Sequence, residues 1–430
     1  MSVQSSVVQR CAICVYGWLT ICAQPLLRRK LRRRGALESG YLENIPERFG
    51  HYVQPAEGHR QLIWIHAVSL GEMRAAAVLI KAMRQEMPDL RLLLTHGTAT
   101  GRAEGRSLLG PGDVQVWQPW DTPQATANFF AHFRPRLGVL METELWPNLV
   151  LGADEGGVPL VLANARMSER SLKKAQRLAW LARPIYGRLK AVLAQTQADA
   201  QRLASLGAPV TAVLGNLKFD ATPDPLQCQL ALERRRTLER PILMFASSRE
   251  GEESVLLQAL TQWPQPWPWT VLVVPRHPQR FEEVAQLILA SGHRISRRSS
   301  WGQDLGGMPC DGSSILLGDS LAEMALYYSL ASAALLGGSF LPLGGQNLIE
   351  ACACACPVIL GPHTFNFAEA AEQALSEGAA LRATDLPSAL AQAADLVQEK
   401  TGRASERAQR FARGHRGAAQ ATSKHLQAWL

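Results

Sequence analysis

The feature that most constrains the fold of this chain is a repeated alternation of short apolar runs with helical stretches, which begins near residue 61. Turns of small residues separate the two. Such alternation is typical of βαβ units on a parallel sheet. The first series of expected strands is QLIWIHA (61–67), RLLLT (91–95), VQVWQPW (114–120), LGVLME (137–142), PLVLAN (159–164) and AVLAQT (191–196). The second series is PILMFASS (241–248), WTVLVVPRH (269–277), SILLGD (314–319), AALLGGS (333–339) and PVILGP (357–362).

The alternation stops between residues 217 and 236, where two prolines precede a charged helix start. A stretch of this kind indicates a linker. At 430 residues and 47% hydrophobic, the chain is long enough to bury two cores. We therefore predict an α/β protein with a first Rossmann-like domain (36–217), a linker (218–236) and a second Rossmann-like domain that ends in helices (237–430). In such a pair, ligands are expected at the carboxyl ends of the strands, facing a central cleft.

The N-terminus (1–35) differs from the rest of the chain. Residues 11–27 (CAICVYGWLTICAQPLL) are mostly apolar, and the basic run RRKLRRRG (28–35) follows at once. A secretory signal would carry its positive charge before the apolar run. We expect a membrane anchor that spans the bilayer, and the alternative is an amphipathic helix that lies on its surface. The basic run would keep the following domains in the cytoplasm and would hold anionic headgroups.

The net charge indicates which kinds of partner the protein could bind, and the cysteines indicate the redox state of its compartment. A formal net charge of +8 suits an acidic partner such as nucleic acid, anionic lipid or a phosphorylated substrate. Six of the eight cysteines gather in two tight groups without a disulfide framework, which favours a reducing compartment. The second group lies in the segment ACACAC (351–356). We expect a helix over residues 346–355, and in a helix the side chain of Cys354 points away from those of Cys352 and Cys356. The three thiolates then cannot converge on one metal ion, and they pack as small apolar residues.

Polar, glycine-rich segments follow nearly every expected strand, which points to an active site. Glu72 ends a Ser-Leu-Gly-Glu turn at the start of a helix. It either complements the helix dipole or takes a proton from an incoming hydroxyl group. Glu142 and Glu144, which follow another strand, are the rival acids.

The segment GGSFLPLGGQNLIE (337–350) places glycines before a helix, where free N–H groups bind phosphate. It matches neither the P-loop nor the Gly-x-Gly-x-x-Gly pattern, which argues against NAD. Arg276 and His277 follow another strand and could add positive charge. Glu350 could accept hydrogen bonds from ribose hydroxyls. No Asp-x-Asp occurs near these loops, so leaving-group charge would fall to Arg276 and to helix dipoles.

Taken together, these motifs resemble those of the 3-deoxy-D-manno-octulosonic acid (Kdo) transferases of lipopolysaccharide biosynthesis. The resemblance runs from the N-terminal anchor to about residue 375. The motifs that carry it are RFG (48–50), HAVSLGE, T-x-TG within 95–101, ETELWPNL, NARMSERS, GNLKFD, PRHPQRF, GGS…P-x-GG-x-N and GPHTFNF.

The resemblance implies a glycosyltransferase of GT-B architecture at the cytoplasmic face of the inner membrane. It would move Kdo from CMP-Kdo to a lipid A precursor (lipid IVA) with inversion, and without a metal or another cofactor. Glu72 would be the general base, and Arg276 would contact the CMP phosphate. The remaining donor-binding residues would be His277, Gly337, Gly338, Ser339, Gln346, Asn347, Glu350, Ser248 and Arg249. We assign acceptor contacts to Ser69, Thr98, Gly101, Glu142, Glu144 and Arg166.

Two positions depart from the family pattern. Gln346 replaces a usual His, so it can donate a hydrogen bond but cannot titrate. Arg249 stands where the family tends to have Ser-Thr-His before Gly-Glu, and it keeps a permanent cation that could serve an anionic donor. Two alternatives stay open: another GT-B sugar-nucleotide transferase or epimerase, and a membrane-anchored nucleotide-sugar binding protein without turnover.

Overall fold

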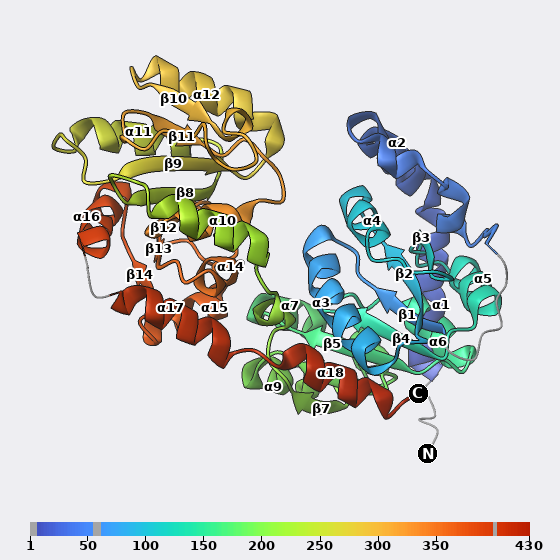
Figure 1. Cartoon of the computed structure of the whole chain (residues 1–430). Coiled ribbons are helices and arrows are strands. Elements are labelled where there is room, and N and C mark those ends of the chain that lie inside the picture. Colours follow the sequence, from blue (N-terminus) through green and yellow to red (C-terminus); the bar gives the residue numbers. More distant parts are fainter. Residues whose placement is uncertain (1–6, 55–61, 399–401) are drawn as a thin grey trace. The chain divides into compact units, whose positions relative to one another are not determined.

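The computed structural model describes residues 7–54, 62–398 and 402–430, and it divides into two compact units (Figure 1). Unit 1 comprises Met1–Asp220 together with Arg416–Leu430, and unit 2 comprises Ala221–His415. The last residues of the chain, from Arg416 onward, thus group with unit 1 and not with the second domain, in which the sequence analysis placed them.

Unit 1 is built on a parallel sheet of seven strands in the order β3-β2-β1-β4-β5-β6-β7. The strands are β1 (Leu62–His66), β2 (Arg91–His96), β3 (Val114–Trp117), β4 (Leu137–Met141), β5 (Leu160–Ala165), β6 (Ala191–Ala194) and β7 (Val210–Val213). The helices that connect them are α3 (Leu70–Glu86), α4 (Ala99–Arg106), α5 (Pro123–Phe133), α6 (Pro147–Glu155), α7 (Glu169–Arg177), α8 (Ala179–Tyr186) and α9 (Gln197–Ser205). The C-terminal helix α18 (Ala418–Gln427) packs against α3.

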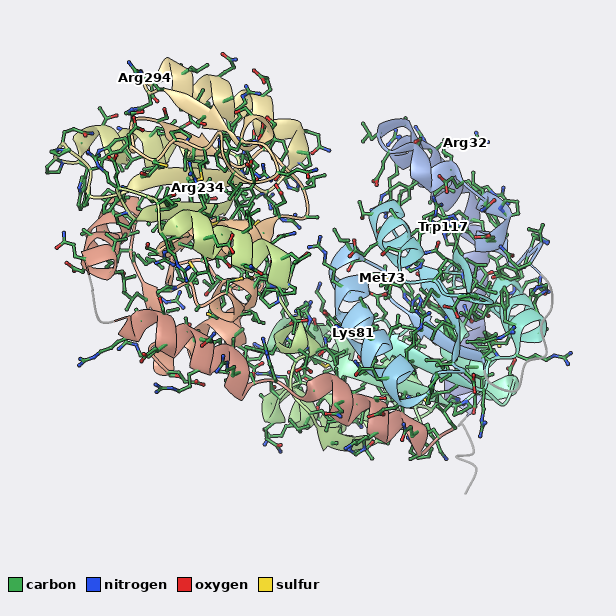
Figure 2. The ribbon with its side chains drawn as sticks, viewed as in Figure 1. Arg32, Met73, Lys81, Trp117, Arg234 and Arg294 are labelled. Atoms are coloured by element: carbon green, nitrogen blue, oxygen red, sulfur yellow. The ribbon has the colours of Figure 1, made fainter. Side chains whose placement is uncertain are left out.

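Strands β1, β4 and β5 are buried along their whole length, as expected for parallel strands covered on both faces. One core cluster contains Trp64 and Phe129, and a second contains Ile65 and Met73. Helix α3 shows the matching amphipathic pattern, because Met73 is fully buried while Lys81 on the same helix is exposed (Figure 2).

The N-terminal segment forms two helices, α1 (Val7–Cys22) and α2 (Gln24–Leu37). Pro25 lies in the first turn of α2, and the basic run belongs to α2. Within the described ranges, no helix has both the length and the apolar character needed to cross a membrane. The expected spanning helix over 11–27 is therefore not observed, because the apolar run divides between a short helix and the start of a strongly basic one.

Unit 2 carries a second parallel sheet in the order β10-β11-β9-β8-β12-β13-β14. Its strands are β8 (Ile242–Ser248), β9 (Thr270–Pro275), β10 (Ile295–Arg297), β11 (Ile315–Leu317), β12 (Ala333–Leu336), β13 (Val358–Leu360) and β14 (Ala380–Arg382). Its helices are α10 (Pro225–Arg235), α11 (Glu252–Gln262), α12 (Phe281–Ala290), α13 (Met324–Leu330), α14 (Ile349–Ala353), α15 (Ala368–Ser376), α16 (Leu386–Gln398) and α17 (Arg403–Gly414).

The expected linker over 218–236 is mostly structured. Its central part is α10, which packs against α13 and accepts a hydrogen bond on Gln227 from the backbone N–H of Leu326 at 3.2 Å. The predicted fold class is confirmed, since both units are doubly wound α/β layers of the kind expected for GT-B proteins.

The cysteine helix is shorter than expected. Helix α14 ends at Ala353, Ala355 has a positive φ of 57°, and Cys356 precedes β13. Cys352 and Cys356 are buried, and burial raises the pKa of Cys352 to about 12. Over the described residues, no cluster of three or more His, Cys, Asp or Glu side chains is placed to hold a metal ion.

Candidate active site

Each sheet has one position at which the strand order reverses, and many of the sequence-predicted residues follow the strands at these positions, while Thr98, Arg166 and Arg276 follow β2, β5 and β9. In unit 1 the reversal lies between β1 and β4, and in unit 2 between β8 and β12. The connections leave in opposite directions there, which opens a crevice at the carboxyl ends of the strands. Glu72 follows β1, Glu142 and Glu144 follow β4, and the loops 248–253 and 337–347 follow β8 and β12.

Glu72 is held at the start of α3 by the turn that precedes it. Ser69 caps the helix, and its hydroxyl donates to Glu72 Oε1 at 3.1 Å. The backbone N–H of Val68 donates to Glu72 Oε2 at 2.7 Å. Burial, together with the nearby negative charge of Glu144, raises the pKa of Glu72 to about 7. In the described part of the chain no Lys or Arg pairs with Glu72, so this carboxyl group can exchange a proton near neutral pH.

The rival acids have other partners. Glu142 is buried and accepts from Arg166 Nε at 2.7 Å and from Lys218 Nζ at 3.0 Å. Burial alone would raise the pKa of Glu142, but the two cations hold it below its usual value. Glu144 accepts from the indole N–H of Trp146 at 2.9 Å. Glu142 is therefore a poor proton acceptor. Burial raises the pKa of Glu144 as it does that of Glu72, and of these two acids Glu72 is the one held by the turn at the start of α3.

Several residues assigned to acceptor contacts also support the Glu72 turn, and their contact with an acceptor stays a prediction. Ser69 is the helix cap described above. The Thr98 hydroxyl donates to the carbonyl of Val68 at 3.0 Å and accepts from the N–H of Gly101 at 3.1 Å. A Cβ on Gly101 would lie 3.1 Å from that same carbonyl, a tight contact, so a larger residue would require α4 and the turn to move slightly apart. Arg166 faces Glu142.

In unit 2, basic side chains gather after β8 and β9. Burial and the charges of Arg249, Arg276 and Arg280 lower the pKa of His277. Arg276 also donates its backbone N–H to the carbonyl of Ser248 at 3.0 Å, which ties the two loops together. Arg280 is paired with Glu253 and Glu283, whereas Arg249 and Arg276 add positive charge beside His277, which suits a phosphate or a carboxylate.

The glycine loop after β12 holds a protein carboxylate. Glu252, which is fully buried, accepts from the N–H groups of Gly338 at 2.7 Å and Phe340 at 3.2 Å, and from Arg249 N–H at 2.9 Å. The sequence analysis predicted that free N–H groups of this loop would bind phosphate. Those of Gly338 and Phe340 are already used, because strand pairing places β8 beside β12 and brings Glu252 to them.

Glu253 forms a second buried connection. It accepts from the Ser248 hydroxyl at 2.8 Å and from both terminal nitrogens of Arg280, at 2.7 and 3.1 Å. The sequence analysis missed Glu252, Glu253 and Arg280. The two acids of SSREGEE lie in the first turn of α11, where the helix dipole alone would account for them, so no separate signal of their buried partners was present in the sequence.

The remaining donor-site predictions lie around the same loop. Ser339 is fully buried and accepts from the N–H of Gly361 at 2.8 Å. A Cβ on Gly337 would lie 2.4 Å from the carbonyl oxygen of Ser247, and one on Gly338 would lie 3.2 Å from Gln346 Nε2. The Asn347 side chain accepts from Ile349 N–H at 3.0 Å, and Glu350 lies in α14. Ser248, Ser339 and Gly337 thus shape the loop, while Gln346 lies against it.

Comparison with known proteins agrees with this arrangement. Residues 43–221 match the family described as 3-Deoxy-D-manno-octulosonic-acid transferase (kdotransferase). The chain is 43% identical over 422 residues to the 3-deoxy-D-manno-octulosonic acid transferase of Bordetella pertussis, with 94% of this chain and 96% of the relative covered. It is 33% identical over 364 residues to the enzyme of the same name from Haemophilus influenzae, with 82% of this chain and 83% of that relative covered.

Among solved structures, Anabaena HepE in complex with UDP has a similar fold, with a TM-score of 0.56 at 15% identity over 86% of this chain and 100% of HepE. The chain therefore belongs to the 3-deoxy-D-manno-octulosonic acid transferases, a family of glycosyltransferases.

Proposed function

We propose that this protein moves Kdo from CMP-Kdo to a lipid A precursor (lipid IVA), with inversion and without a catalytic metal. The observation that carries the proposal is Glu72, a half-buried carboxyl group at the β1–β4 reversal with a pKa raised to about 7. A group of this kind can take the proton of a sugar hydroxyl at neutral pH. Membership of the Kdo transferase family supports Kdo as the transferred sugar.

The proposed step is one displacement at the anomeric carbon. The acceptor hydroxyl oxygen forms a bond to this carbon while its proton passes to Glu72. The bond between the same carbon and the phosphate oxygen breaks, and its electron pair leaves with CMP. A single displacement inverts the configuration, and Glu72 then returns the proton to solvent.

The positive edge of unit 2 is proposed to receive the donor. Arg249 and Arg276 are permanent cations beside His277, and CMP-Kdo carries both a phosphate and a carboxylate. Charge that develops on the departing phosphate would be stabilised by these side chains. Asn347, Gln346 and Glu350 follow the glycine loop and would contact the nucleotide.

The N-terminal helices support a location at the cytoplasmic face of the inner membrane. On α1, Trp18 and Leu19 are 73% and 63% exposed, and on α2 Leu26 is 69% exposed. The basic run comes directly after Leu26 and Leu27 and lies within the same helix, α2. Exposed apolar side chains beside a cationic run are typical of helices that lie in the interface of an anionic bilayer.

A mass measurement tests the proposal. The purified full chain is incubated with CMP-Kdo and the lipid A precursor, in parallel with UDP-sugars, each with and without EDTA. We expect the acceptor mass to increase by whole Kdo units with CMP-Kdo alone and at an unchanged rate in EDTA. Product from a UDP-sugar, or no product from CMP-Kdo, would contradict the donor assignment. Activity that EDTA removes and a divalent cation restores would contradict the metal-independent step.

A further inference from the structure

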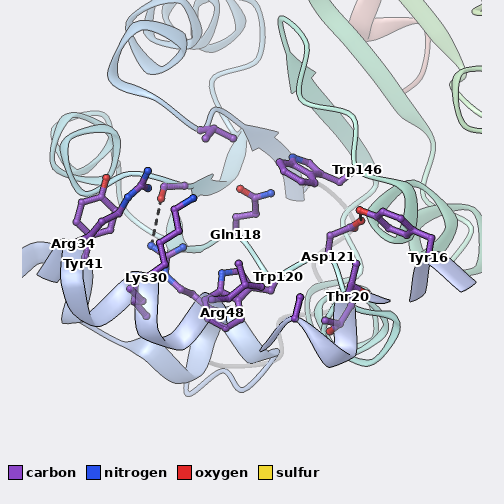
Figure 3. Close-up of a pocket in the computed structure, with 16 residues that line it drawn as sticks. Tyr16, Thr20, Lys30, Arg34, Tyr41, Arg48, Gln118, Trp120, Asp121 and Trp146 are labelled. Atoms are coloured by element: carbon purple, nitrogen blue, oxygen red, sulfur yellow. Dashed lines mark hydrogen bonds between the residues drawn. The ribbon is translucent and has the colours of Figure 1, made fainter. Parts of the chain in front are cut away.

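Unit 1 contains a pocket of about 390 Å³ that none of the predicted acceptor residues lines (Figure 3). The residues around it come from α1, α2, the short 3-10 helices Ser39–Leu42 and Ile45–Phe49, and the loops after β1, β2, β3 and β4. One wall is apolar, with Leu27, Leu31 and Trp120, and cationic side chains of Lys30, Arg34 and Arg48 stand around the same space. We name this space the α2 pocket. Its lining combines what an apolar chain and an anion require.

Arg48 is the unusual member of the lining. Its side chain is almost fully buried, with the residue 4% exposed, and its guanidinium stacks on the Trp117 ring at 3.8 Å. One terminal nitrogen donates to the carbonyl of Gly97 at 3.4 Å, and the buried Nε has no hydrogen-bond partner. Among the described residues no carboxylate pairs with it. A buried cation without a counter-charge is costly, so this environment favours a bound anion.

The nearest acids are already engaged. Glu47, next in sequence, accepts from Arg102 at 2.9 Å and from the Trp117 N–H at 2.8 Å. Asp121 also lines the pocket, but it accepts from the Tyr16 hydroxyl at 2.8 Å and from Leu149 N–H at 2.8 Å. Figure 3 shows Asp121 beside Tyr16, away from Arg48. Neither carboxylate forms an ion pair with Arg48; the negative charge of Glu47 still acts on it, but burial lowers the pKa of Arg48 to about 10.

The pocket also adjoins the proposed base. Val68 is part of its lining, and the N–H of the same residue donates to Glu72 Oε2 at 2.7 Å. Val68 is thus shared between the lining of the pocket and the turn that holds Glu72. This position fits a group of the acceptor better than an unrelated membrane lipid.

We infer that the α2 pocket binds a phosphate group of the acceptor glycolipid, with Arg48 beneath it, Lys30 and Arg34 at its rim, and an acyl chain along Leu27 and Leu31. This inference rests on the proposed function and adds to it the part of the acceptor that is recognised. The phosphate would lie against the guanidinium of Arg48, a lining residue that no described carboxylate contacts in an ion pair, and would add negative charge beside it.

The test uses the full chain with two acceptors, the phosphorylated lipid A precursor and the same molecule after enzymatic dephosphorylation. The variants are Arg48→Gln, Arg48→Lys and, as a matched control on the surface of unit 1, Arg106→Gln. We expect Arg48→Gln to raise the KM for the phosphorylated acceptor about tenfold or more, with the KM for CMP-Kdo unchanged. Arg48→Lys should recover part of this loss, and Arg106→Gln should match the wild type. On the dephosphorylated acceptor, wild type and Arg48→Gln should have the same KM.

Equilibrium binding of both acceptors, measured without donor, separates this inference from the proposed function. Phosphate-dependent binding that requires Arg48 supports the α2 pocket even if no Kdo is transferred. Kdo transfer with equal KM for both acceptors overturns the pocket while the proposed function stands. Weaker binding of Arg48→Gln to phosphatidylglycerol vesicles, without any change in acceptor KM, would assign the pocket to a membrane lipid and overturn the inference. Loss of folding in Arg48→Gln is detected by its melting temperature, and Arg48→Lys then supplies the comparison.

Discussion

At the scale of single residues, Glu252 and Glu253 show how two adjacent acids can hold different loops. Glu252 accepts backbone N–H groups from the loop after β12, and Glu253 pairs with Arg280 beyond β9. Both carboxylates are buried, and their partners lie in the loops that also carry Gln346 and Arg276. We therefore regard Glu252 as a positioning residue that keeps the glycine loop in shape for the donor.

Replacing Glu252 should separate this role from a purely structural one. Glu252→Ala leaves several buried N–H groups without an acceptor. We therefore expect the free energy of unfolding to fall by about 3 kcal/mol. Glu252→Gln keeps one acceptor oxygen, so it should cost less stability but still raise the KM for CMP-Kdo more than kcat falls. Denaturant unfolding and donor kinetics measure the two effects, with exposed Glu250→Ala as the control. A normal donor KM in Glu252→Gln would argue against the positioning role.

Sequence reasoning found Glu72 but not Glu252, and the difference is physical. Glu72 has its supporting contacts from Val68 and Ser69 within four residues, so the local pattern contains most of its environment. Gly338, which donates to Glu252, is 86 residues away in sequence. The contact exists because β12 pairs with β8, and that order cannot be derived from spacing in one sequence. Arg48 and the α2 pocket were missed for the same reason.

At the scale of elements, every strand predicted from an apolar run is present, and the three that were missed lie at sheet edges. β7, β10 and β14 close the ends of the two sheets. Edge strands are covered less completely, and in β10 no residue is fully buried. Their sequences therefore lack the continuous apolar run that identifies a central parallel strand. The division of α1 from α2 was missed because Pro25 is compatible with a helix start as well as with a helix end.

Helix α18 shows a contact that no local pattern revealed. Asp220 accepts from the backbone N–H groups of Gly417 and Ala419, and Ser423 donates to Glu86 at 2.7 Å. Asp220 thus supplies the N-terminal hydrogen bonds of α18 in unit 1. We expect Asp220→Ala to lower stability by about 1 kcal/mol, as loss of a helix cap does. Thermal unfolding measures the change, and Asp224→Ala, which removes the cap of α10 in unit 2, is the comparison. An unchanged melting temperature in Asp220→Ala would show that α18 is held without this cap.

At the scale of the whole molecule, charge and exposed apolar side chains concentrate in the N-terminal helices. Arg28, Arg29, Arg32 and Arg33 are all exposed on α2 (Figure 2 labels Arg32). Together with the exposed apolar residues of α1, they form the surface that we propose binds an anionic bilayer. Each unit, taken by itself, presents loops at its own strand-order reversal, as the proposed anionic donor and lipid acceptor require.

Vesicle binding tests the membrane surface. Arg32→Gln with Arg33→Gln should weaken binding to anionic vesicles by about 1 kcal/mol per residue, because each cation near the surface contributes about that much. Binding to zwitterionic vesicles should change little, and high salt should reduce the difference. The control pair Arg294→Gln and Arg403→Gln, on exposed positions of unit 2, should bind as the wild type does. Equal losses in both pairs would show that net charge, and not the α2 surface, drives association.

The pH dependence of Kdo transfer tests the central claim most directly, namely that Glu72 is the base. The group must be deprotonated to act, so kcat/KM should rise about tenfold per pH unit below about pH 7 and then level off. Because the pKa of Glu72 in the folded protein is above its ordinary value, its ionisation lowers stability as pH rises from about 4.5 to about 7. Glu72→Gln should therefore be at least as stable as the wild type at pH 8.

The decisive comparison is Glu72→Gln against wild type across this pH range, with CMP affinity measured on the same samples. For Glu72→Gln we expect a loss of about 10²- to 10⁴-fold in kcat/KM, no inflection near pH 7 and unchanged CMP affinity. A variant that keeps wild-type activity, or that keeps the inflection near pH 7, would contradict the claim that Glu72 is the base.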